Sequence, residues 1–160
     1  MTAKVARVTM ILSAAVLSAV LAANAQSKDP FVGTWTLNVA KSTYSPGPVP
    51  KSITSTYEAA GTGYKVAVTN ISGTGKVEYG YTSSLDGKDV PVTGNNPDAD
   101  TLAVQRIDAS TLETVSKKGG KVTITQRNVL SADGKTRTVT TTGIDATGQK
   151  VHNVAVFEKR

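Results

Sequence analysis

The chain has 160 residues, no cysteine and a formal net charge of +6 at pH 7, and this length is typical of a single domain. The lack of cysteine excludes disulfides, thiol nucleophiles and thiolate metal ligands. Its basic residues are scattered singly apart from the pairs Lys117-Lys118 and Lys159-Arg160, whereas nucleic-acid-binding domains gather them on one face. We therefore expect a solvated, mildly basic surface and no nucleic-acid partner.

The N-terminal segment has the order of a secretory signal peptide. A basic start, an apolar run over 8–23 and small residues up to Ala25 follow one another, which predicts a signal peptide over 1–25. An uncleaved membrane anchor is the alternative, but the run is shorter than the ~20 residues that span a bilayer. The expected mature domain is 26–160, a monomer with no integral membrane span, exported to the periplasm or out of the cell.

Ten strands are predicted in the mature domain. Segments rich in Thr and Val, which favour a pleated surface, alternate with turns rich in Gly, Asp or Asn. No window shows sustained helical periodicity. The predicted strands are 34–39, 52–58, 64–71, 77–83, 89–92, 101–107, 111–116, 122–130, 136–143 and 151–158.

The turns predict an antiparallel meander. Gly119-Gly120 and Asp133-Gly134 supply the positive φ angles that tight hairpins require. Each strand is apolar on alternate positions, so one face of the sheet is buried. Closing the sheet hides that face and removes both edges, whereas a two-layer sandwich leaves edges to protect. We expect an all-β, up-and-down meander of about ten strands closed into a small barrel, with a sandwich as the alternative.

The segment 41–51 differs from the rest of the domain. Its prolines at Pro46, Pro48 and Pro50 fix φ and remove backbone donors, so it is neither a central strand nor a helix interior. Two interpretations stay open. It is an extended peptide that covers one mouth of the barrel, or a stiff crossover loop between two strands.

Both ends of the domain resemble a known superfamily. Gly33-Thr34-Trp35 on the first strand resembles the Gly-x-Trp motif of calycins, which include lipocalins and fatty-acid-binding proteins. Val156-Phe157-Glu158-Lys159 is similar to the closing strand of fatty-acid-binding proteins. The chain as a whole looks most like small exported lipocalin-like proteins of bacteria. The resemblance implies a calycin-like barrel in which Trp35 plugs the closed end and Gly33 allows tight packing there.

The chain departs from that superfamily at two points. Fatty-acid-binding proteins carry a helical pair after the first strand, which the proline-rich segment cannot form. They commonly hold the fatty-acid carboxylate with an Arg-x-Tyr pair on the last strand, and the matching positions here are Ala155 and Phe157. A fatty acid held in that manner is therefore not expected.

The predicted function is binding of a small, mainly apolar ligand inside the barrel. Tyrosines alternate with other residues along two strands, and one arginine shares a strand face with apolar residues, so inward faces would form an apolar pocket with hydroxyls and one charge. The candidate ligand-binding residues are Tyr57, Tyr79, Tyr81, Arg106 and Phe157. Ordinary cross-strand packing of the tyrosines is the alternative, as is an envelope structural or protein-interaction module without a ligand.

An enzyme is not expected. The only histidine, His152, has the opposite parity to Phe157 on the last strand and points to solvent if Phe157 points inward. Asp98-Ala99-Asp100 lacks the spacing of a calcium loop and is explained by side-chain-capped turns, so neither a metal nor another cofactor is predicted. With aromatic residues at 5%, the strands also lack the girdles of a membrane-spanning barrel.

Overall fold

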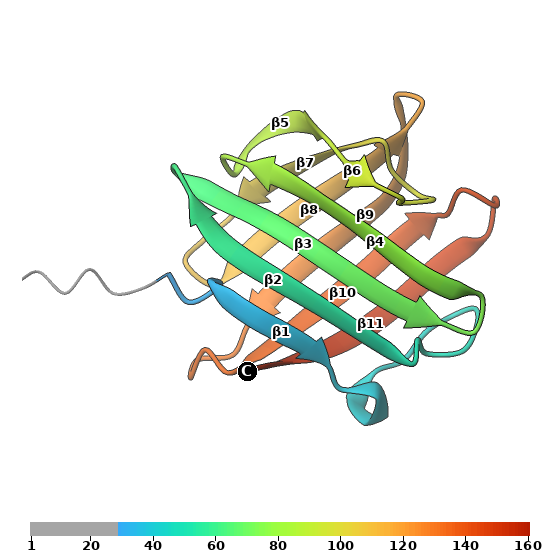
Figure 1. Ribbon diagram of the computed structural model, residues 1–160, viewed down its shortest axis with the longest axis horizontal. Helices are drawn as coiled ribbons and strands as arrows, with labels where there is room; N and C mark the ends of the chain where they lie inside the picture. Colours follow the sequence, from blue (N-terminus) through green and yellow to red (C-terminus); the bar gives the residue numbers. More distant parts are fainter. Residues whose placement is uncertain (1–28) are drawn as a thin grey trace, which may run out of the picture.

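The computed structural model describes residues 29–160, which form one antiparallel sheet of 11 strands wrapped into a nearly closed barrel (Figure 1). The predicted signal peptide, 1–25, lies outside the described residues. Within 29–160 the structure contains no helix of the length and apolarity needed to cross a membrane. The strands are β1 (Gly33–Leu37), β2 (Ser52–Ala60), β3 (Gly63–Ser72), β4 (Gly75–Ser83), β5 (Asp86–Pro91), β6 (Thr93–Gly94), β7 (Thr101–Arg106), β8 (Thr111–Lys118), β9 (Lys121–Leu130), β10 (Thr136–Ile144) and β11 (Lys150–Lys159).

The sheet order confirms the predicted antiparallel meander, which wraps into a nearly closed barrel. Strands β7 to β11 are neighbours in chain order, as are β1 to β4. The two runs are joined because the last strand pairs with the first, with Leu37 opposite Phe157. In Figure 1 the strands β1–β4 cross in front of β8–β11, so the two runs form facing walls of one barrel. A two-layer sandwich is excluded, since a single sheet continues from one wall into the other.

The meander is interrupted between β4 and β7, where sequence reasoning placed one short strand. Instead of pairing with β4, strand β5 pairs with β7, and the unpredicted β6 pairs with β4. Gly94 permits this pairing because it has a φ of +84° and a Cβ there would lie 2.5 Å from the Glu78 carbonyl oxygen. The sheet therefore keeps two edges here, at β5 and β6.

The proline-rich segment extends the barrel wall where β1 ends. Thr43 and Val154 exchange two backbone hydrogen bonds of 2.8 Å, and the Ser45 carbonyl oxygen accepts from the His152 N–H at 2.7 Å. The Ser45 N–H in turn donates to Asn153 Oδ1 at 3.0 Å. These bonds attach the start of the segment to the part of β11 that β1 leaves unpaired.

The closed end of the barrel is filled by apolar side chains. Phe31 and Trp35 are fully buried there, and Leu112 and Leu130 are nearly so. The Trp35 Nε1–H donates to the Phe31 carbonyl oxygen at 2.9 Å, which satisfies its one polar group. At Gly33, with a φ of +136°, a Cβ would lie 2.8 Å from Lys159 Cε, so a larger residue would displace that side chain.

Candidate functional site

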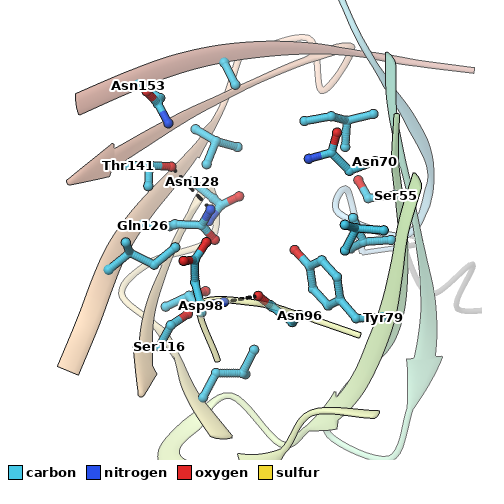
Figure 2. A pocket seen from close by; sticks show the side chains of 18 of the residues that line it. Ser55, Asn70, Tyr79, Asn96, Asp98, Ser116, Gln126, Asn128, Thr141 and Asn153 are labelled. Atoms are coloured by element: carbon cyan, nitrogen blue, oxygen red, sulfur yellow. Dashed lines mark hydrogen bonds between the residues drawn. The ribbon is translucent and has the colours of Figure 1, made fainter. Parts of the chain in front are cut away.

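A cavity of about 230 Å³ lies inside the barrel, between the apolar closed end and the opposite mouth. Figure 2 looks into this space and shows side chains from both walls pointing toward its centre. Strand alternation produces this arrangement, because every second residue of a barrel strand faces inward. Register then aligns the inward residues in rows. Asn128, Val139 and Ala155 form one such row, and Gln126, Thr141 and Asn153 form the next toward the mouth.

The two walls of the cavity differ in chemistry. We call β1–β4 with their connecting segments the aromatic half, since most of its inward side chains are aromatic or aliphatic. Strands β8–β11 make up the polar half, which presents amides and hydroxyls together with a few apolar residues. The aromatic half lines the cavity with Tyr44, Ile53, Tyr57, Val68, Val77, Tyr79 and Tyr81, together with Ser55 and Asn70. The polar half lines it with Thr114, Ser116, Gln126, Asn128, Thr141 and Asn153, besides Ile124, Arg137, Val139, Ala155 and Phe157.

Arg137 of β10 reaches from the polar half to the aromatic half across the inner end of the cavity. It is 2% exposed. Its Nη1 donates to the Tyr57 hydroxyl at 2.5 Å and its Nη2 donates to Ser55 Oγ at 2.8 Å. The guanidinium carbon lies 4.6 Å from the ring centroid of Phe157, 4.8 Å from that of Tyr57 and 5.3 Å from that of Trp35. The cation is thus held by aromatic faces and neutral hydroxyls.

No carboxylate among residues 29–160 forms an ion pair with this cation. Within residues 29–160 the ion pairs do not include Arg137, and its Nε is buried without a hydrogen-bond partner. A buried charge normally has an opposite charge or a full set of hydrogen bonds, because the loss of hydration is costly. An unneutralised guanidinium beside a cavity therefore has the properties of an anion-binding group.

Four of the five candidate residues from the sequence, Tyr57, Tyr79, Tyr81 and Phe157, line the cavity. Their predicted role in ligand binding stays a prediction. Arg106, the fifth, is not among the lining residues.

Arg106 lies at the closed end, where its Nη2 is 2.6 Å from the Asp29 carboxylate. The same nitrogen hydrogen-bonds the Tyr64 hydroxyl, and the guanidinium stacks on Phe31. It is the last residue of β7 and pairs with the buried Leu112, so it lies beyond the cavity floor. Its charge is engaged there and does not reach the cavity.

The cavity's cation, Arg137, was missed by sequence reasoning. A signal for it exists in the alternation of β10, where Arg137 shares a face with Val139, whose side chain is the apolar one typical of an inward position. Threonines on both faces of β10 weaken that pattern, and this explains why the inward face was not assigned.

The tyrosines of the cavity are neutral hydrogen-bonding groups. Burial raises the pKa of Tyr44 to about 12. Burial also raises the pKa values of Tyr79 and Tyr81 above the ordinary tyrosine range, and the nearby phenol of Tyr57 raises them further. Figure 2 shows the Tyr79 hydroxyl pointing into the cavity. These phenols donate and accept hydrogen bonds at neutral pH without carrying charge.

The loop before β7 brings an acidic group to the mouth. Asp98 lines the cavity, and its Oδ1 accepts from the Ala146 N–H at 2.9 Å. Its own N–H donates to Asn96 Oδ1 at 2.9 Å, which is the side-chain-capped turn expected from the sequence. Residues 29–160 contain no cluster of three or more His, Cys, Asp or Glu side chains arranged to hold a metal ion. His152 is exposed on the outer face of β11.

Comparisons with known proteins leave the chain without an assigned family. No family model matches it, and no curated protein matches it. Among solved structures, it is similar to zebrafish ileal bile acid-binding protein complexed with cholic acid. That match has 14% sequence identity, a TM-score of 0.47, and covers 82% of this chain and 99% of the zebrafish protein.

Proposed function

We propose that this protein is an exported binding protein that holds a small organic anion in its barrel, with the anionic group on Arg137. The supporting observation is the buried guanidinium, which lies at the inner end of a cavity without a carboxylate partner. A carboxylate or similar group would supply the missing negative charge. Export through the predicted signal peptide and a monomeric state belong to the same proposal.

Arg137 has hydrogen-bonding capacity left for such a ligand. A guanidinium has five N–H donors, and the bonds to Tyr57 and Ser55 use two of them. Hydrogen bonds between a guanidinium and a carboxylate are short and strong, and they become stronger where water is excluded. The aromatic rings around Arg137 hold the group in place before the ligand arrives, which lowers the entropic cost of binding.

The size and lining of the cavity describe the rest of the ligand. A volume of about 230 Å³ is below the roughly 300–1,000 Å³ of sites for drug-sized molecules. One wall is aromatic and aliphatic, while the other carries amides and hydroxyls. In place of the mainly apolar ligand expected from the sequence, we propose a small acid with one apolar face and one polar edge.

Isothermal titration calorimetry with a panel of small carboxylates, phosphate and sulfate tests this proposal. The variant Arg137→Gln is compared with Arg127→Gln, which removes an exposed arginine from the neighbouring strand. We expect Arg137→Gln to weaken anion binding at least tenfold, since hydrogen bonds to charged groups contribute ~1.5–3 kcal/mol. The control variant should bind as the wild type does.

Two outcomes would count against the proposal. One is a panel in which no anion binds to the wild type, and the other is binding that survives Arg137→Gln in a folded protein. Thermal melting of each variant establishes that it is folded. In either case the interaction module without a ligand becomes the favoured alternative.

A further inference from the structure

The lining of the cavity contains polar side chains that the protein itself leaves without partners. Asn128, Thr114 and Ser116 of the polar half are each 4–5% exposed, and none of their side chains has a hydrogen bond within residues 29–160. Across the cavity, Asn70 Oδ1 is also buried without a partner. Buried polar groups in folded proteins are nearly always hydrogen-bonded. Asn128, Thr114 and Ser116 line the cavity, so a molecule that enters it can supply their missing hydrogen bonds.

These groups specify neutral, hydroxyl-like partners. An amide carries both donors and acceptors, and a serine or threonine hydroxyl does both as well. A ligand hydroxyl has the same dual character and matches either kind. An alkyl chain would leave all of these groups unpaired, and each unpaired group would weaken binding.

The opposite wall suits the face of a ring. Tyr57 lies on β2 and Tyr79 and Tyr81 lie on β4, with β3 between the two strands. On β3, Val66 pairs with both Tyr57 and Tyr81, and Val68 pairs with Tyr79. Rings and branched side chains at these positions form an apolar surface on which the C–H face of a saturated ring can pack. A ligand with hydroxyls along its edge and carbon-bound hydrogens on its face fits both walls at once.

From this arrangement we infer that the ligand is a hydroxyl-rich acid of monosaccharide size, such as a hexuronic acid. The inference rests on the proposed function, because the carboxylate of the acid is the group that Arg137 would bind. Its ring would lie against the tyrosines, and its hydroxyls would bond the amides and hydroxyls of the polar half.

Asp98 adds a reason for one orientation of the ligand. Only one of its carboxylate oxygens, Oδ1, has a hydrogen-bond partner among the described residues, and the group lies at the mouth. Its negative charge would repel a ligand carboxylate and accept a hydrogen bond from a hydroxyl. The acid group is thereby directed to Arg137 and a hydroxyl to the mouth.

Three probes of similar ring size separate the contribution of the hydroxyls to binding from the contribution of the acid group. Glucuronate carries a ring, hydroxyls and an acid, cyclohexanecarboxylate carries the ring and the acid only, and glucose carries the ring and the hydroxyls only. By calorimetry we expect glucuronate to bind at least tenfold more tightly than either of the others. Sites built to hydrogen-bond a ligand hydroxyl discriminate strongly against analogues that lack it.

A pair of variants assigns the discrimination to the polar half. Asn128→Leu removes an amide whose paired neighbours on both sides, Leu112 and Val139, are apolar, so a leucine side chain has compatible surroundings. We expect it to weaken glucuronate binding at least tenfold and to change cyclohexanecarboxylate binding less than twofold. Gln105→Leu, an exposed amide on β7, is the matched control and should change neither.

The outcomes distinguish this inference from the proposed function. If cyclohexanecarboxylate binds as tightly as glucuronate, or if folded Asn128→Leu weakens both acids equally, the inference is overturned while anion binding at Arg137 stands. If neither acid binds while another anion of the panel binds through Arg137, the inference is overturned and the proposed function stands. If no anion of the panel binds, or if both acids bind independently of Arg137, the proposed function fails and the inference fails with it.

Discussion

In both the aromatic half and the polar half of the barrel every second residue faces inward, but the inward side chains of the two halves differ in chemistry. In the aromatic half the inward positions carry groups that pack against one another, as in the edge-to-face contact of Tyr57 with Tyr64, whose ring centroids are 5.7 Å apart. In the polar half the side chains of Asn128, Thr114 and Ser116 are buried and have no hydrogen-bond partner in the part of the chain that the structure describes. The first arrangement stabilises the fold, while the second lowers its stability and provides hydrogen-bonding capacity for another molecule.

Arg137 connects the two halves. It belongs to β10 in the polar half, yet its hydrogen bonds go to Tyr57 and Ser55 in the aromatic half. The residue therefore lies where the packed and the unsatisfied regions meet. This position explains why the cavity has its charge at the inner end, near the closed end, and its uncharged polar groups along one wall.

Truncating the aromatic half at the closed end should destabilise the protein most. Trp35→Ala removes a fully buried indole and its hydrogen bond to Phe31. We expect the free energy of unfolding to fall by ~3–5 kcal/mol, as is usual for buried aromatic residues. Chemical denaturation measures this change, and a loss below 1 kcal/mol would show that the closed end is not the packed region described above.

Alkaline pH should destabilise the aromatic half, because it carries the tyrosines and the amides of the polar half do not titrate. The pKa of Tyr44 is raised by burial from 10.0 to about 12 in the folded state. The stabilisation from this group is complete below pH 10 and is lost as pH rises through 12, by ~1–3 kcal/mol.

The variant Tyr44→Phe isolates this effect from the other tyrosines. Its free energy of unfolding should fall less between pH 9 and pH 12 than that of the wild type, and denaturation at a series of pH values measures the difference. Identical slopes for both proteins would mean that the Tyr44 phenol is not buried in the folded state.

Replacing an unpaired polar side chain of the polar half should have the smallest effect on the free energy of unfolding. In contrast to the two changes above, it should raise that free energy. Asn128→Leu replaces a buried amide without partners by a side chain that suits its apolar neighbours. We expect the free energy of unfolding in the absence of ligand to rise by ~1 kcal/mol, as determined by chemical denaturation. A decrease of similar size would indicate that the amide has a structural partner, such as an ordered water molecule.

The local features of the fold were predictable from the sequence. All ten predicted strands are present, with ends shifted by at most three residues, since Gly119-Gly120 and Asp133-Gly134 specify hairpins through nearest-neighbour geometry. Alternation within β11 likewise predicted Phe157 inside and His152 outside. These features depend on a few adjacent residues, so a linear reading is sufficient for them.

The tertiary structure decided which polar residues share the cavity. Arg106 and Arg137 each share a strand face with buried apolar residues, so alternation alone does not show which of them reaches the cavity. The distinction arises because pairing of β11 with β1 and the stagger of the strands set the depth of each residue along the barrel. Arg106 lies at the depth of the closed end, where it forms an ion pair with Asp29, whereas Arg137 lies at the depth of the cavity and lines it. Depth is a property of the whole closed sheet, which no single segment of the sequence encodes.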